Sequence, residues 1–192
     1  MLSNINVENQ NSMASIDIAF SHHSQGDLSS AEKIYLELIN ANNDLTAMNA
    51  YSALLSQLQR YEEAHEILGK AIDISKNTHE NLLPALLNSR GNLYRRQNNS
   101  LAAIKDYKTC LALSATYFPA INNLATAYLQ ADNISKAETY YNQAISIQPN
   151  NSSLQVNLAI CYIKKNNLDA ARDALTAALT IAPNDFTATR QL

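Results

Sequence analysis

The sequence predicts an all-α protein that consists of repeated pairs of helices, and three observations support this prediction. The 192 residues contain only three glycines and four prolines, whereas an all-β chain needs many turn-forming residues. Apolar residues recur at i, i+3, i+4 and i+7 through most of the chain, which is the spacing of one helix face. Short motifs recur about every 34 residues, a period typical of stacked helix–turn–helix repeats.

The composition argues against several classes of protein. Apolar residues make up 46% of the chain, which is too many for a disordered protein. A net charge of −3 with 16% charged residues disfavours nucleic-acid binding, because phosphate neutralisation needs clustered cations. Residues 1–13 lack the pattern of a secretory signal, and no stretch approaches the ~18 apolar residues of a membrane span. We therefore expect a cytoplasmic protein.

The repeat is carried by an alanine that follows a short polar turn and by a large residue four positions later. The alanines are Ala31, Ala64, Ala103, Ala137 and Ala171. The large residues are Tyr35, Leu68, Tyr107, Tyr141 and Leu175. The segments Asn-Leu-Ala-Thr-Ala-Tyr (123–128) and Asn-Leu-Ala-Ile-Cys-Tyr (157–162) show the same periodicity upstream of the turn. Small residues at these positions allow two helices to approach closely, so each repeat is expected to be one helical hairpin.

These motifs resemble the tetratricopeptide repeat (TPR), whose period is about 34 residues. The resemblance gives five repeats, numbered here 1 to 5: residues 12–44, 45–78, 84–117, 118–151 and 152–185. Repeats 1 and 2 depart from the family pattern, with His22 and Leu55 where an aromatic residue is usual. The resemblance implies a right-handed superhelical α-solenoid of antiparallel helix pairs, in which neighbouring repeats must stack to bury their apolar faces.

The segments that flank the repeats have their own expected roles. Residues 1–11 are expected to form a flexible tail. Residues 79–83 exceed the period and are expected to lengthen the loop before repeat 3, with Pro84 in the first turn of the next helix. Pro149 and Pro183 should end second helices, and the segments 150–151 and 184–185 should cap the helices that follow. Residues 186–192 should start a capping or truncated helix.

The sequence contains no motif for catalysis, for a cofactor or for a metal. Gly69-Lys70 lacks the first glycine of a phosphate loop, because Ala64 occupies that position. His22 and His23 are adjacent on a helix and point about 100° apart, which disfavours a shared metal. His22 falls at a core position of the repeat and is expected to be packed. Cys110 and Cys161 lack metal spacing and are expected to be buried, free thiols.

In the TPR family, as the resemblance implies, the first helix of each repeat lines a concave groove that binds extended peptides or partner helices. Helical phase predicts which residues point away from the packing positions. In repeat 1 these are Ile16, Phe20 and His23. The predicted groove residues of repeats 3 to 5 are Asn88, Asn92, Arg95, Arg96, Asn122, Asn123, Thr126, Leu129, Gln130, Val156, Asn157, Ile160, Ile163 and Lys164.

Three features of these predicted groove residues have both a functional and a structural interpretation. The amides of Asn92, Asn123 and Asn157 could hold a peptide backbone, or they could simply be solvated. The stripe of Val156, Ile160 and Ile163 predicts an exposed apolar patch, unless the chain's own tail or a further repeat covers it. Arg95, Arg96 and Lys164 favour acidic partners, but cations near the end of a helix are also favoured by its dipole.

The sequence therefore predicts a non-catalytic scaffold for protein–protein interaction, with an acidic or amphipathic protein or peptide as its partner. One alternative is the N-terminal targeting arm of a larger enzyme, similar to a glycosyltransferase or a sulfotransferase, that is truncated at Leu192. Another alternative is an assembly factor for a secretion or pilus system. Self-association through the terminal repeats is also consistent with the sequence.

Overall fold

A computed structural model describes residues 15–78 and 80–191 of the chain, and the predicted tail, residues 1–11, lies outside this part. The all-α prediction is confirmed, since the described residues form helices and turns without a strand. The chain divides into two compact units within one helix, between Leu93 and Tyr94. Each unit is described by itself below.

The N-terminal unit contains a helix over residues 15–24 and four longer elements. These are α2 (Leu28–Asn42), α3 (Leu45–Gln57), α4 (Tyr61–Thr78) and most of α5 (Leu83–Arg96). Helix α3 contacts both α2 and α4. The loop expected over residues 79–83 is not an open loop, because α4 extends to Thr78 and a 3₁₀ turn, η1 (Glu80–Leu82), leads directly into α5. Pro84 lies in the first turn of α5, as predicted.

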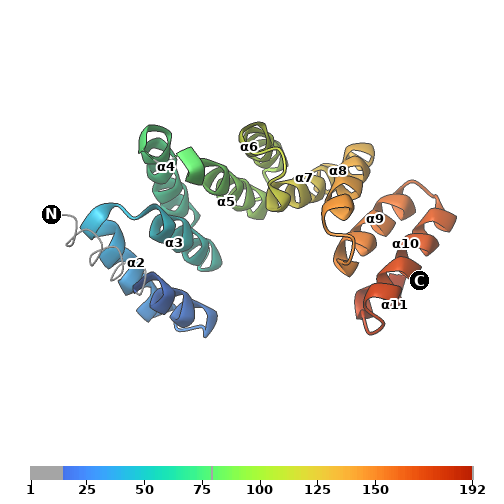
Figure 1. Cartoon of the computed structure of the whole chain (residues 1–192), viewed down its shortest axis with the longest axis horizontal. Helices are drawn as coiled ribbons and strands as arrows, with labels where there is room; N and C mark the ends of the chain where they lie inside the picture. The colour runs from blue at the N-terminus through green and yellow to red at the C-terminus, as the bar shows by residue number, and fades with distance from the viewer. Residues whose placement is uncertain (1–14, 79, 192) are drawn as a thin grey trace. The chain divides into compact units, whose positions relative to one another are not determined.

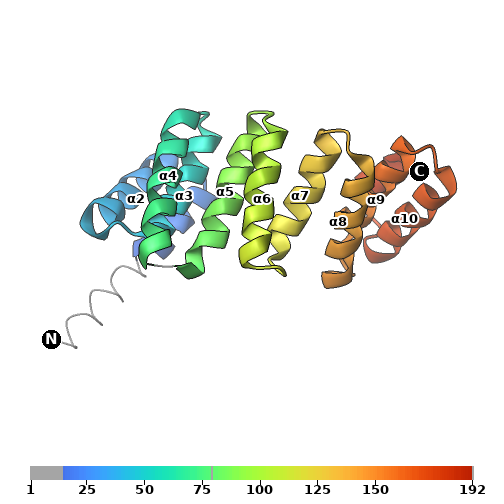
Figure 2. The ribbon, with the colours of Figure 1, turned by 90° about the horizontal axis from the view of Figure 1, so that it is seen from above.

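The C-terminal unit starts with the end of α5 and contains six further helices. These are α6 (Ser100–Leu113), α7 (Phe118–Gln130), α8 (Ile134–Ile147), α9 (Ser152–Lys164), α10 (Leu168–Ile181) and the short α11 (Phe186–Gln191). Each helix from α6 to α10 contacts the next one along the chain. Figures 1 and 2 show α7 with α8 and α9 with α10 as successive antiparallel hairpins.

The turn inside each hairpin has the same chemistry in most repeats. One residue adopts a left-handed conformation, at Gly26, Gln59, Asn98, Asp132 and Asn166. The next residue in four repeats is an N-cap whose side chain accepts a backbone N–H, namely Asp27, Asn99, Asn133 and Asn167. A side-chain N-cap contributes about 1 kcal/mol, so these short polar residues fix where the second helix starts in these four repeats.

The caps predicted between the repeats are confirmed in one case and wrong in the other. Asp185 accepts the backbone N–H groups of Thr187 and Ala188 at 2.9 and 3.1 Å, which caps α11. Asn151 precedes α9 but makes no side-chain cap. Its amide donates instead to the Gln148 side chain at 3.2 Å, because the turn after α8 brings these two residues together.

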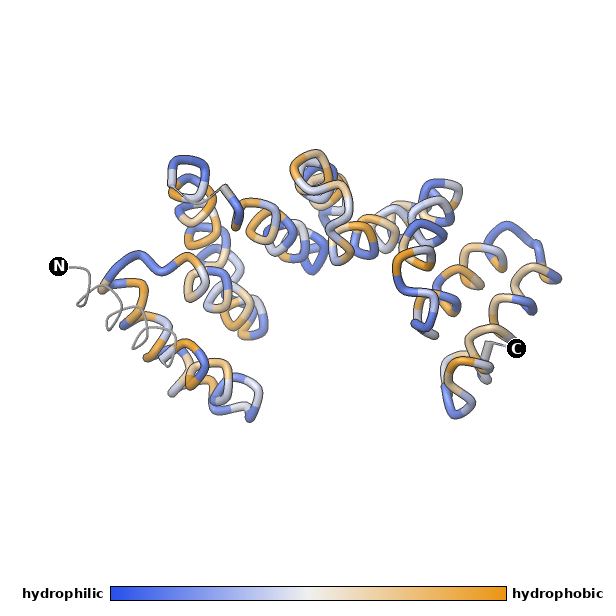
Figure 3. The backbone as a smooth tube through the Cα atoms, viewed as in Figure 1, coloured by the Kyte–Doolittle hydropathy of each residue, from blue (hydrophilic) through white to orange (hydrophobic). Residues whose placement is uncertain are grey.

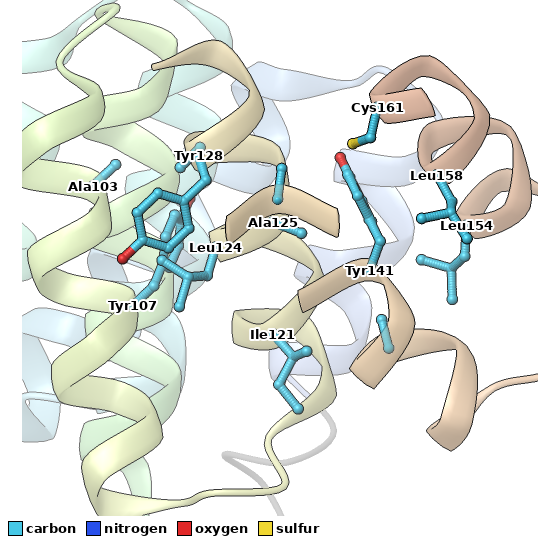
Figure 4. Packing of buried hydrophobic residues seen from close by; sticks show 13 residues of the cluster. Ala103, Tyr107, Ile121, Leu124, Ala125, Tyr128, Tyr141, Leu154, Leu158 and Cys161 are labelled. Atoms are coloured by element: carbon cyan, nitrogen blue, oxygen red, sulfur yellow. The ribbon is translucent and has the colours of Figure 1, made fainter. Parts of the chain in front are cut away.

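The core is built from the residues that carry the repeat. The five alanines are between 0 and 3% exposed, and Tyr35, Tyr107 and Tyr141 are completely buried. Figure 3 shows hydrophobic and hydrophilic residues alternating around each helix. In the C-terminal unit the buried cluster includes Leu124 of α7, Tyr141 of α8 and Leu158 of α9. Figure 4 shows Tyr141 between α7 and α9 with its hydroxyl toward Cys161.

Candidate functional site

The candidate site is the side of α7 and α9 that the core leaves accessible, called here the first-helix face of the C-terminal unit. Its members are half-buried or exposed: Asn123, Thr126, Leu129, Gln130, Asn157, Ile160, Ile163 and Lys164. The two helices present the same repeat positions, so that Asn123 corresponds to Asn157 and Thr126 to Ile160. Residues of α7 and α9 share one buried cluster beneath this face. The face is therefore a repeated arrangement of amide, hydroxyl and apolar side chains.

The other predicted groove residues are divided between the two units. Asn92 is half-buried in the N-terminal unit, whereas Arg95 and Arg96 lie at the end of α5 in the C-terminal unit. Arg95 is half-buried and Arg96 is exposed. In repeat 1, Phe20 is 41% exposed and lies edge-on to Tyr35, with ring centroids 6.2 Å apart.

Three residues predicted to be exposed on first helices are buried, so this part of the prediction is wrong. Ile16, Asn88 and Val156 are 9, 8 and 4% exposed. They occupy equivalent positions in repeats 1, 3 and 5, and the residues at this position in repeats 2 and 4 are half-buried. Val156 packs with Ala174 of α10 and Ala188 of α11. The chain's own C-terminal helix thus covers one end of the predicted apolar stripe, while Ile163 remains 37% exposed.

The predicted row of asparagines also needs a correction. In repeat register Ser89, not Asn92, corresponds to Asn123 and Asn157, and Asn92 corresponds to Thr126. A different row of amides, which the sequence analysis missed, occupies the position just described in repeats 2 to 4: Asn49, Asn88 and Asn122. Asn88 is buried, and the other two are half-buried. The Oδ1 atoms of Asn49 and Asn122 are buried without a hydrogen-bond partner. Alignment of the repeats from their first residue would have revealed this row.

Polar residues of the first helices meet the hydroxyl groups of the buried tyrosines. The Thr126 hydroxyl lies 3.1 Å from the Tyr141 hydroxyl. His23 Nδ1 lies 3.3 Å from the Tyr35 hydroxyl. Burial raises the pKa of Tyr107 to about 12, and a hydrogen bond from Arg95 acts in the opposite direction. Each tyrosine therefore packs its ring in the core and offers its hydroxyl to a residue of a first helix.

Charges are segregated between the two kinds of helix. The first helices α3, α5, α7 and α9 contain no aspartate or glutamate, although the whole chain carries a net charge of −3. The acidic residues of repeats 2 to 5 lie on second helices and in the segments between helices, whereas Asp17 lies on the first helix of repeat 1. Asp132 of a turn is 3.2 Å from Lys164, and Glu138 of α8 is 2.6 Å from Lys165. The first-helix face is thus neutral to cationic on an acidic protein.

The histidines and cysteines give no second site among the described residues. His22 is not packed as predicted, because its side chain is 36% exposed and lies 3.0 Å from Asp27. Cys110 and Cys161 are free and buried, as predicted, and burial raises the pKa of each thiol to about 11. The described part of the chain holds no group of three His, Cys, Asp or Glu residues suited to a metal ion. None of its helices is long and apolar enough to cross a membrane.

Comparison with known families identifies the class of protein. Models of the tetratricopeptide repeat match residues 45–81, 84–117, 118–151 and 136–192. The chain therefore belongs to the tetratricopeptide repeat family, whose members are α-solenoid proteins that bind other proteins.

One curated relative is similar in sequence, and solved structures show the same fold. An uncharacterized protein, Ycf37 of Porphyra purpurea, is 28% identical over 89 residues, which are 46% of this chain and 51% of that protein. A chain of the APC/C hetero-tetramer Cut9–Hcn1 matches 94% of this chain over 35% of its own length, with a TM-score of 0.79 and 21% identity. YrrB, described as a TPR protein with an unusual peptide-binding site, matches 98% of this chain and 95% of its own, with a TM-score of 0.69 and 16% identity. The chain thus spans about half of the curated relative.

Proposed function

We propose that this protein is a non-catalytic scaffold that binds an extended peptide or a partner helix on the first-helix face of the C-terminal unit. The observation that carries the proposal is the pair of amides, Asn123 and Asn157, at the same repeat position of α7 and α9. A side-chain amide can both donate to and accept from a peptide backbone. The side chain of Asn157 is half-buried and makes no hydrogen bond within the described residues. YrrB, a fold neighbour, is itself described with a peptide-binding site.

The apolar residues of α9 support the same interpretation. Ile160 is half-buried at the edge of the last cluster, and Ile163 is 37% exposed. Covering such a side chain with a partner would contribute up to about 1.5–3 kcal/mol. An amide that holds a peptide backbone beside an apolar contact for its side chains is an arrangement suited to a peptide ligand.

The proposal also includes a cellular location and a single array of repeats. Two buried, free thiols support a cytoplasmic location. That the five repeats act as one array stays a prediction. No observation in the described residues favours the targeting-arm or assembly-factor alternatives over the scaffold.

The test is a peptide selected against the full chain from a displayed random library. Its affinity is then measured for the wild type, for the double variant Asn123→Ala/Asn157→Ala and for Asn142→Ala, an exposed asparagine on α8. Each amide contributes one or two hydrogen bonds of about 0.5–1.5 kcal/mol, so the double variant should bind about 10- to 100-fold more weakly. The control should bind like the wild type. Unchanged affinity of a well-folded double variant would refute the proposed site.

A further inference from the structure

We propose that the C-terminal unit recognises a side-chain carboxylate of an extended acidic peptide, and that Arg95 is the residue that receives it. This inference rests on the proposed function and specifies the chemistry of the partner. It depends on three observations: the Arg95 guanidinium is partly buried without an ion pair, it lies beside the first-helix face, and the first helices around it carry no acidic residue.

The guanidinium of Arg95 is a partly desolvated charge without a counter-ion. Arg95 is half-buried, and its Nε atom is buried with no hydrogen-bond partner. Within the described residues Arg95 forms no ion pair. Cations removed from water are normally paired with an anion, because desolvation is otherwise uncompensated. A guanidinium can bind a carboxylate through two parallel hydrogen bonds.

Arg95 lies near the tyrosine hydroxyls beside the first-helix face, and its hydrogen bond is to Tyr107. Its charge lowers the pKa of Tyr107 and that of Tyr141 against the larger, opposite effect of burial. The Tyr141 hydroxyl in turn lies 3.1 Å from the Thr126 hydroxyl, and Thr126 is a member of the face. Arg95 also occupies the same repeat position as Leu129 and Ile163. A ligand that runs along the face therefore passes close to the guanidinium.

The charges of the first helices favour an anion at this place, and the buried carboxylate near Arg95 is Asp106 of α6, which raises the pKa of Tyr107. Helices α5, α7 and α9 contain no acidic residue, so no carboxylate of these helices competes for Arg95. Lys164, the other cation of the face, is already 3.2 Å from Asp132. Arg96 is adjacent but exposed, so water screens its charge more strongly. Arg95 is thus the cation best placed to discriminate a glutamate from a glutamine in a bound peptide.

The experiment compares three pools of random peptides of about eight residues with the full chain at low ionic strength. One pool has Glu fixed at a central position, the second has Gln there, and both are acetylated and amidated. The third is the Gln pool with a free C-terminal carboxylate. Affinity is measured by fluorescence anisotropy for the wild type, for Arg95→Gln, for Arg95→Lys and for Arg172→Gln. Arg172 is the matched control, because its side chain on α10 is 70% exposed.

We expect the wild type to bind the Glu pool about tenfold more tightly than the amidated Gln pool, which corresponds to about 1.4 kcal/mol. Arg95→Gln should abolish this preference, Arg95→Lys should retain part of it, and Arg172→Gln should retain all of it. As a second readout, the Nε–H resonance of Arg95 should shift on addition of the Glu pool only.

Three outcomes would overturn the inference. Equal binding of the two amidated pools by the wild type would leave peptide binding intact but remove the carboxylate preference. A preference that survives in Arg95→Gln would show that Arg95 does not receive the carboxylate. A preference for the pool with the free C-terminus over the Glu pool would assign the site to a terminal carboxylate instead. If none of the pools binds, the proposed function and the inference fail together.

Discussion

Replacement of Tyr141 tests whether the buried tyrosines stabilise the repeats by packing or by hydrogen bonding. The ring is completely buried between residues of α7 and α9, and the hydroxyl lies 3.1 Å from that of Thr126. Loss of the whole side chain in Tyr141→Ala leaves a cavity, and comparable aromatic-to-alanine changes cost about 3–5 kcal/mol. Loss of the hydroxyl alone in Tyr141→Phe removes one hydrogen bond, which is worth about 0.5–1.5 kcal/mol.

The smaller value applies to Tyr141→Phe because the change leaves no polar group stranded. The Thr126 hydroxyl still donates to the backbone carbonyl of Asn122 at 3.1 Å. The alanine variant should therefore lose at least about twice as much unfolding free energy as the phenylalanine variant.

The assay is urea unfolding of the full chain, followed by circular dichroism at a fixed temperature. Free energies are compared only where the slope with urea is unchanged, because repeat proteins can unfold in more than one step. Tyr140→Ala serves as the control on the same helix, since Tyr140 is half-buried and stacks on Tyr128 at 5.7 Å. It should cost less than Tyr141→Ala. Equal losses for Tyr141→Phe and Tyr141→Ala would refute the packing argument.

Three further variants test the electrostatics of the first repeats and the burial of α9. The Tyr51 hydroxyl, and then Arg60, hold the pKa of Glu32 below its usual 4.5. The stabilisation by ionised Glu32 is therefore complete above about pH 4.5 and is lost as the pH falls through the folded-state pKa. The difference in unfolding free energy between wild type and Glu32→Gln should shrink at low pH in urea titrations, and a pH-independent difference would contradict this. Val156→Asp should lower the unfolding free energy by several kcal/mol, since it buries an unpaired carboxylate. The control Ile163→Asp should leave the melting temperature nearly unchanged. Equal melting temperatures of the two variants would show that Val156 is not buried.

The helix pairs could be predicted from the sequence because local chemistry defines them. The space between the two helices of one hairpin requires a small residue at Ala137 and a large one at Tyr141. Both side chains are completely buried, as expected. The turn residues Asp132 and Asn133 adopt the left-handed and N-cap conformations that short polar side chains favour. Each of these features depends only on neighbours within the same repeat.

The orientation of individual side chains toward the next repeat could not be predicted in the same way. Val156 looks like a surface residue in the helical phase of α9 alone, but Ala188 of α11 packs against it. Likewise Asn151 has the identity of a helix cap, yet Gln148 provides a competing partner at 3.2 Å. In both cases the outcome depends on a segment outside the helix concerned. Pattern analysis within one element contains no information about that segment.

The tyrosine position explains how one framework can present different chemistry in each repeat. Repeats 1, 3 and 4 have Tyr35, Tyr107 and Tyr141 at this position, whereas repeats 2 and 5 have leucine. The ring supplies the packing that leucine supplies elsewhere, so the hairpin is unchanged. The hydroxyl adds a polar contact at the edge of the core, and the residue that meets it differs each time: His23, Arg95 or Thr126. The first helices can therefore change their side chains, and with them the ligand, while the second helices keep the same core.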